Sequence, residues 1–207
     1  MGIPEQAAKV LETMNRAGAI ASHLHLDNAP PQRHRIAWAL LRLAFDHARS
    51  MAFLIANQQW ELTGSAFALA RVTNDALVRG AWFALHANDD QTQRFLDKDE
   101  IPSRTMSADV EGHPPFDSFN IFTQLRNNVW DLLNSFTHSG VQAIGAYIDG
   151  ETIGPAHRPE DVHAILGYAE SVAVVAILIL VMMTESQDPT RVEPLKADLM
   201  ALVNTPK

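Results

Sequence analysis

The chain has 207 residues, 47% of them hydrophobic, and no cysteine, so it can bury a core but cannot form disulfides, thiolate metal sites or a cysteine nucleophile. Its formal net charge is −8, and the acidity is concentrated in residues 88–207, where 18 Asp and Glu face 8 Lys and Arg. This charge argues against broad, non-specific DNA binding, which depends on neutralising phosphates. Because no signal-peptide pattern opens the chain, we expect a cytoplasmic protein with one domain over residues 1–207.

Apolar residues at helical spacing predict two helices in the first part of the chain. The first covers residues 4–26 and is ended by Asn28-Ala-Pro-Pro31, because proline cannot continue a helix. The second runs from Gln32 to about Gln59 and has one apolar and one charged side. Both are typical of helices packed at the outside of a bundle.

The third predicted helix, residues 62–86, is apolar nearly all round, which is typical of a helix in the middle of a bundle. It nevertheless carries Arg71, Asp75 and Arg79 at helical spacing, with Asn74 beside them. Buried charges must be paired, and two arginines around one aspartate leave one positive charge for a carboxylate elsewhere, water or an anionic ligand. The alternative is an ion-pair ladder that only fixes the register of the helix.

Residues 88–118 are acidic, contain three prolines and show little periodicity. We expect an irregular excursion, with short helical turns near residues 91–96 and 103–110. A stretch of this length without regular elements is typical of a lid or binding loop, so it is a candidate cover for a site on the bundle.

Residues 119–149 predict a long amphipathic helix that ends at Thr137-His-Ser-Gly140 and restarts at once. A polar stripe runs along it and ends at the break, and it consists of Asn127, Asp131, Asn134 and His138. A histidine in this position is the most site-like feature of the sequence. The alternative interpretation of the stripe is a solvated face.

The last long helix is predicted over residues 159–186, followed by a short closing helix over 189–202. Its twelve apolar residues 172–183 are too few for a membrane span, which needs about twenty, so we expect a buried helix that also forms a homodimer interface. Glu160 and His163 have the spacing of a di-iron motif but lack the second pair that such a site needs. We therefore expect neither a metal nor a cofactor.

Two segments, ALARVTNDALVRGAW (68–82) and WDLLNSFTHSG (130–140), resemble an uncharacterised bacterial all-helical family. Its members carry a helix of the form L-R-x-x-x-E-A-L-x-R-G-x-W and later a W-x-x-[LM]-N-[SD]-[YF]-[TV]-H-[ST]-G segment. Here Asp75 stands where a Glu is usual, and Val72 stands where a Pro is common. The family is distantly similar to the HEPN superfamily of helical, often dimeric proteins, and this resemblance implies a ribonuclease role in phage defence or toxin–antitoxin systems.

The catalytic signature of that superfamily is an Arg and a following His with four to six residues between them. The pairs Arg42–His47 and Arg79–His86 have this spacing, but chance alone yields such pairs in a chain with 12 Arg and 9 His, and neither Arg is followed by a polar residue. The signature is therefore absent in its usual form.

The fold prediction is all-α, a bundle of four to five long helices with the excursion at about 88–118. For function, the residues favour a non-catalytic interaction or small-anion-binding module with a pocket around Arg71, Asp75, Arg79 and His138. The further ligand-binding candidates are Asn74, Trp82, Trp130, Asp131 and Asn134.

The alternative is an enzyme acting on RNA or a nucleotide, with His138 as general acid or base, Arg71 and Arg79 on a phosphate, and Asp75 orienting an arginine. A third possibility is a helical scaffold in which these polar groups are structural. The shared pocket requires the His138 and arginine side chains to approach within about 10 Å of each other, because they must reach one ligand.

Overall fold

The computed structural model describes residues 1–26, 29–58, 61–118, 120, 122–123, 134–185, 189–190, 192–193 and 195. The all-α prediction is confirmed, with one small hairpin added. The elements are α1 (Ile3–Ser22), α2 (Gln32–Gln58), α3 (Thr63–Leu85), α4 (Asp89–Lys98), α5 (Met106–Glu111), the 3-10 turn η1 (Phe116–Ser118), α7 (Val141–Gly145), β1 (Ile148–Asp149), β2 (Thr152–Ile153) and α8 (Pro159–Glu185).

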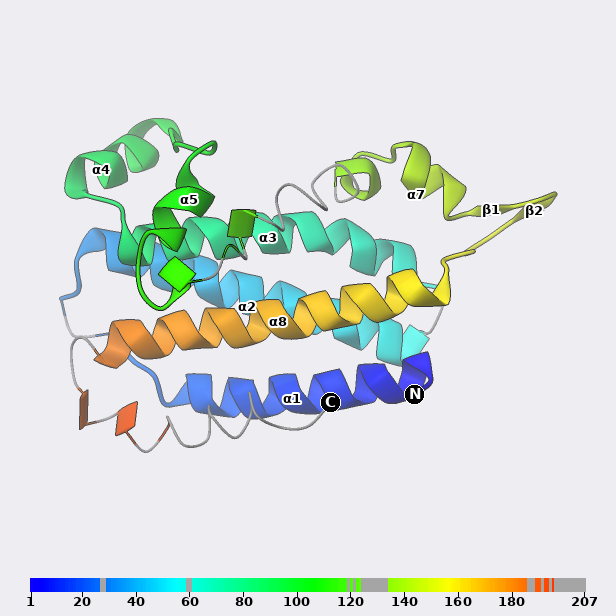
Figure 1. Ribbon diagram of the computed structural model, residues 1–207, viewed down its shortest axis with the longest axis horizontal. Coiled ribbons are helices and arrows are strands. Elements are labelled where there is room, and N and C mark those ends of the chain that lie inside the picture. The colour runs from blue at the N-terminus through cyan, green and yellow to red at the C-terminus, as the bar shows by residue number, and fades with distance from the viewer. Residues whose placement is uncertain are drawn as a thin grey trace.

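The long helices α1, α2, α3 and α8 lie side by side and form the bundle (Figure 1). Helix α8 contacts α1, α2 and α3, and α2 contacts α3 along its length. Apolar residues of all four elements are fully buried between them, and the nearly all-apolar α3 and α8 each bury about half of their residues. The largest of these side chains include Met14, Leu41, Leu77, Trp82, Phe83, Leu166, Ile177 and Leu180.

Helix α8 is long and apolar enough to cross a membrane by length and composition alone, a property that buried helices of soluble proteins share. In this bundle 56% of its most apolar stretch is buried against neighbouring helices. Its packing against three helices accounts for the apolar run of residues 172–183.

Helices α2 and α3 approach closely at Gly80. A methyl group added there would lie 2.9 Å from Leu41 Cγ and 3.1 Å from its backbone nitrogen. Glycine at this position therefore lets the two backbones meet, and it fixes how α3 presents the arginines on either side of Asp75.

The segment 88–118 is more regular than the sequence analysis predicted. Asn88 forms a capping box with Gln91 at the start of α4, and Asp99 ends that helix in the left-handed conformation. Helix α5 then packs on α3 (Figure 1). The short helical turns predicted near residues 91–96 and 103–110 are therefore confirmed as α4 and α5, and α4 is longer than predicted because of its strong local cap.

The predicted restart after Gly140 is correct only for the five residues of α7, because the chain then turns into a hairpin. Strands β1 and β2 pair antiparallel, Ile148 with Ile153 and Asp149 with Thr152, around Gly150 at φ 59°. Glycine at the first position of a two-residue loop, flanked by β-branched residues, is typical of such a turn. The first part of the predicted 119–149 helix lies mostly outside the described residues.

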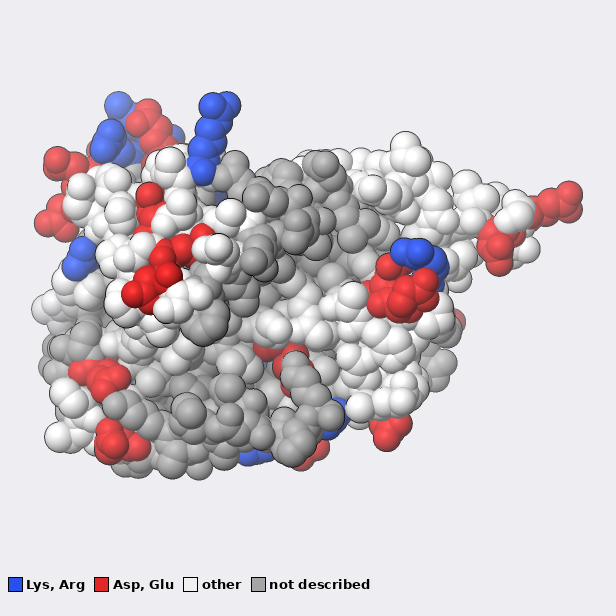
Figure 2. Space-filling model, viewed as in Figure 1, with Lys and Arg blue, Asp and Glu red and all other residues white. Residues whose placement is uncertain are grey.

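Charged groups are distributed over several elements of the face shown in Figure 2. Acidic side chains gather near α4 and α5, and others lie at the tip of the hairpin. An adjoining basic and acidic patch lies at the start of α8, where Arg158 pairs with Glu160 and Asp161. On this face, the described Lys and Arg do not merge into one basic surface.

Candidate functional site

One face of α3 receives the segment 134–138, which is about seventy residues distant in sequence. Phe67 stacks on Phe136 with ring centroids 4.7 Å apart. One residue further on each partner, the Thr137 hydroxyl donates to the Ala68 carbonyl at 3.5 Å. These contacts align the two segments in the same direction and carry them toward the polar residues that follow.

The next contact of this alignment joins Arg71 to His138. Arg71 Nη1 lies 3.3 Å from His138 Nε2. A guanidinium has donors and no acceptor, so Nε2 of His138 accepts in this contact. For Arg71 the distance meets the condition for a shared pocket, since these two side chains can reach one ligand. The Arg71 side chain is 23% exposed and His138 is exposed, so solutes can reach the pair.

Asp75 lies one turn further along α3 and contacts the same arginine, with Arg71 Nε 3.7 Å from Asp75 Oδ2. Burial raises the pKa of Asp75, and the nearby charges of Arg71 and Arg79 lower it by less. The pKa of Tyr168 on α8 is also raised, first by burial and then by the charge of Asp75. Its hydroxyl donates to the Ala70 carbonyl at 3.2 Å. Asp75 therefore lies at the α3–α8 contact, where solvation is poor.

Arg79 is half-buried and forms no hydrogen bond or ion pair with another described residue, although its charge acts on Asp75. Arg71 and Arg79 each lie one helical turn from Asp75, so the three side chains share one side of α3. Guanidinium groups and an exposed histidine are groups that can bind an anion.

A pocket of about 240 Å³ lies between α3, α7 and the start of α8, and it is lined by Phe67 and Phe136 of the same two segments. Its lining residues are Phe67, Phe136, Gln142, Gly145, Ala146, Ala156, His157, Arg158 and Asp161. His157 is 7% exposed and packs parallel to the Phe67 ring at 5.2 Å. Burial lowers the pKa of His157, and the charge of Asp161 raises it by less, so the imidazole is neutral at neutral pH.

The sequence analysis missed this pocket, because His157 lies in a stretch that reads as a linker. Its Nε2 is buried and has no hydrogen-bond partner in the described part of the chain. Tyr147 covers the imidazole from the side at 5.7 Å, and its hydroxyl occupies the space beside Gly64, where α3 has no side chain. The glycine near the start of α3 was the only sequence signal for this contact.

A family model matches residues 41–200, and it spans both segments that suggested a relationship from sequence. Its description is a family of unknown function, DUF6988. The chain belongs to this family. No curated protein and no solved structure matches the chain.

The remaining predicted site residues of this DUF6988 protein fall into three groups. Asn74 and Asn134 lie near Arg71 and His138 in sequence, and each has a buried side-chain oxygen without a hydrogen-bond partner among the described residues. Trp130 and Asp131 lie outside the described residues. Trp82 takes part in a different cluster, at the end of α3.

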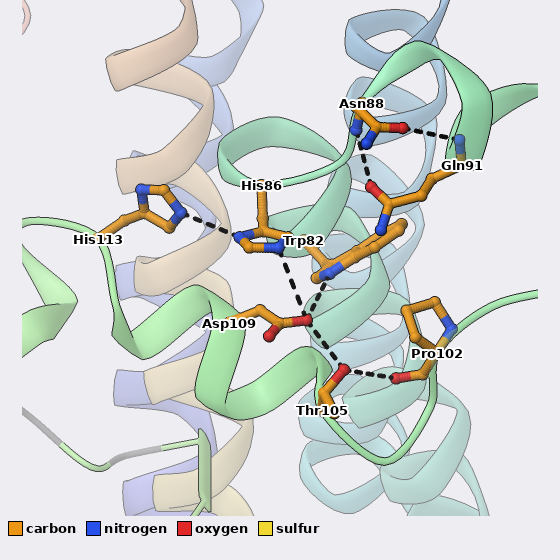
Figure 3. A network of polar contacts seen from close by, with 8 residues as sticks. All are labelled: Trp82, His86, Asn88, Gln91, Pro102, Thr105, Asp109 and His113. Carbon is orange, nitrogen blue, oxygen red and sulfur yellow. Dashed lines mark hydrogen bonds and ion pairs between the residues drawn. The ribbon is translucent and has the colours of Figure 1, made fainter.

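That second cluster surrounds Asp109 of α5 (Figure 3). Its Oδ2 accepts hydrogen bonds from Trp82 Nε1 and Thr105 Oγ1, both at 3.0 Å, and lies 3.9 Å from His86 Nε2. His86 Nδ1 in turn lies 3.2 Å from His113 Nε2. The cluster ties α5 and the following turn to the end of α3.

The sequence offered no signal for this cluster. The Arg79–His86 pair includes one of its residues, but the spacing of that pair has no part in the contacts around Asp109. No group of three or more metal-binding side chains converges within the described ranges, here or at the arginine pair. The cluster is therefore best understood as a polar anchor for α5.

Proposed function

We propose that this protein is a non-catalytic module that binds a small anion between Arg71, Arg79 and His138, with Asp75 holding Arg71 in place. The observation that carries the proposal is the contact between Arg71 and His138, which joins α3 to a segment 67 residues away at an exposed position. Residues so far apart in sequence meet there, and guanidinium and imidazole groups are common ligands of oxyanions.

The contact with Arg71 favours binding over catalysis, because the Nε2 lone pair of His138 accepts a hydrogen bond there. An anion that inserts between the two side chains replaces this contact and accepts the Arg71 N–H.

Calorimetric titration with sulfate at low ionic strength tests the proposal, because sulfate keeps its charge between pH 6 and pH 8. Arg71→Gln weakens binding about tenfold to a hundredfold, since a hydrogen bond to a charged group contributes roughly 1.5–3 kcal/mol. His138→Ala also weakens binding, because it removes the second side chain of the contact.

Lys98→Gln is the matched control, because it removes the same charge from an exposed position at the end of α4. Equal sulfate affinities for the Arg71→Gln and Lys98→Gln proteins would contradict the proposal.

The second candidate is the enzyme implied by the HEPN resemblance, acting on RNA or a nucleotide with His138 as general acid or base. The same Arg71–His138 contact supports it, because an arginine and a histidine also serve phosphoryl chemistry. A nuclease assay on single-stranded RNA compares the parent with His138→Ala. Activity that depends on His138 replaces the binding proposal, whereas equal rates in both proteins remove the enzyme.

A further inference from the structure

The pocket beside the arginine–histidine pair has the size and lining of a site for an aromatic ring. Its volume of about 240 Å³ is enough for a one- or two-ring system. Phe67, Phe136 and His157 line it with three mutually packed rings. Aromatic walls favour planar ligands, because ring pairs gain from stacked and edge-on contacts beyond the area they bury.

His157 adds a polar requirement to this apolar site. The side chain is more than nine-tenths buried, its pKa is lowered by burial, and its Nε2 has no hydrogen-bond partner among the residues described. A buried polar atom without a partner costs about 1–3 kcal/mol, so a ligand that displaces the side chains around Nε2 and donates a hydrogen bond to it gains that free energy. A ring N–H, amino or hydroxyl group is such a donor.

The pocket and the anion site share their supporting residues. Phe67 precedes Arg71 by one helical turn on the same face of α3, which is a rise of about 5–6 Å. Phe136 precedes His138 by two residues at the break that ends its helix. A molecule bound at both places therefore needs an anionic group only a few bonds from its ring.

We infer that the ligand of this protein is an aromatic molecule with an anionic group, its ring in the pocket at Phe67, Phe136 and His157 and its charge at Arg71 and His138. This inference rests on the proposed anion site and adds the ring. Two chemical sources supply such a ligand, a nucleoside monophosphate and an aromatic carboxylate. Their shared chemistry is a planar ring with a hydrogen-bond donor and a nearby oxyanion.

The test compares four probes by calorimetry: sulfate, adenosine, adenosine 5′-monophosphate and indole-3-acetate. We expect at least one of the two ring-bearing anions to bind tenfold or more tightly than sulfate and adenosine, and the tighter one identifies the source. Gln142 is exposed and lines the pocket, so Gln142→Trp obstructs the space for the ring. This substitution lowers the affinity for the ring-bearing anion to that for sulfate and leaves the affinity for sulfate unchanged. Val141→Trp is the control, because Val141 is the neighbour of Gln142, is 85% exposed and does not line the pocket.

The outcomes separate this inference from the proposed function. If sulfate binds as proposed but neither ring-bearing anion binds more tightly, or Gln142→Trp changes nothing, the ring pocket is refuted and the anion site stands. If adenosine binds as tightly as its monophosphate and Arg71→Gln has no effect on either, the anion site fails and the combined ligand fails with it. Loss of the ring-bearing anion in both Gln142→Trp and Arg71→Gln, with retention in Val141→Trp, supports the whole assignment.

Discussion

Replacing His157 by phenylalanine is expected to stabilise the protein. The imidazole is buried among Phe67, Phe136 and Tyr147, and its Nε2 has no hydrogen-bond partner in the described part of the chain. Phenylalanine keeps the ring stacking and removes the polar atom that lacks a partner. The adjoining pocket can take the small increase in volume, so overpacking is slight.

The magnitude follows from the cost of the buried nitrogen. An unsatisfied buried polar atom costs about 1–3 kcal/mol, so His157→Phe raises the free energy of unfolding by about 1–2 kcal/mol at pH 8 after a small steric loss. In a protein of this size, such a gain raises Tm by roughly 2–8 °C. Few single substitutions of a buried polar side chain increase the free energy of unfolding.

The gain also depends on pH. Burial lowers the pKa of His157 from its ordinary 6.5, so the unfolded chain takes up a proton there more readily than the folded protein does. The contribution of this histidine to stability is therefore fully present above pH 6.5 and is lost as pH falls through the lowered pKa. Phenylalanine has no such loss, so the advantage of the variant increases from pH 8 to pH 5.

Urea unfolding at pH 8, 6.5 and 5, monitored by far-ultraviolet circular dichroism, measures both effects. His163→Phe is the matched control, because its Nδ1 bonds to the Gln6 side chain and the Gln6 amide donates to the His163 carbonyl at 3.3 Å. That exchange breaks a satisfied pair and lowers stability by about 0.5–1.5 kcal/mol. A His157→Phe protein less stable than the parent at pH 8 would show that Nε2 is satisfied in the folded protein, and the reasoning about the pocket would fail.

Two further predictions concern packing and the anchor of α5, and both are measured by urea unfolding. Gly80→Ala lowers the free energy of unfolding by about 1–2 kcal/mol, because overpacking at the α2–α3 contact outweighs the gain in helix propensity. Gly167→Ala is the control and raises the free energy of unfolding by about 0.5–1 kcal/mol, because the added methyl meets nothing within 4 Å. Equal effects of the two substitutions would refute the close contact at Gly80. Asp109→Ala lowers the free energy of unfolding by about 1–3 kcal/mol, because the buried Trp82 indole loses its hydrogen-bond acceptor. Asp97→Ala is the control: it loses only an exposed hydrogen bond and changes the free energy of unfolding by less than about 0.5 kcal/mol. An Asp109→Ala protein as stable as Asp97→Ala would contradict the anchor.

The long helices could be predicted from sequence because their apolar spacing and their proline and glycine boundaries are local signals. The predicted range 62–86 differs from α3 by one residue at each end, and 159–186 extends one residue beyond α8. The hairpin after α7 could not be predicted from periodicity, since two-residue strands carry almost none. Its signal was Gly150 between β-branched residues, which the amphipathic pattern before it concealed.

The site was predictable in part for the same reason. Arg71, Asp75 and Arg79 share a helix face, so their proximity follows from spacing alone. The contact of Arg71 with His138 depends on how two segments dock, and the sequence could propose it only as a condition on distance. His157 gave no signal, because its environment comes from α3, from the turn after α7 and from the segment at 136, which are far apart in sequence.

The distribution of unsatisfied polar atoms connects stability with the proposed ligand. In the described ranges, the buried side-chain atoms without a hydrogen-bond partner belong to His34, Asn74, Asn134 and His157. Three of these four lie beside the proposed site: Asn74 follows Arg71 by three residues, Asn134 precedes His138 by four, and His157 packs on Phe67 and Phe136. Natural sequences retain such atoms mainly where function requires them, since apolar replacements would be more stable. The His157→Phe protein should therefore gain stability and lose affinity for the ring-bearing anion together, and a purely structural histidine would give the first change without the second.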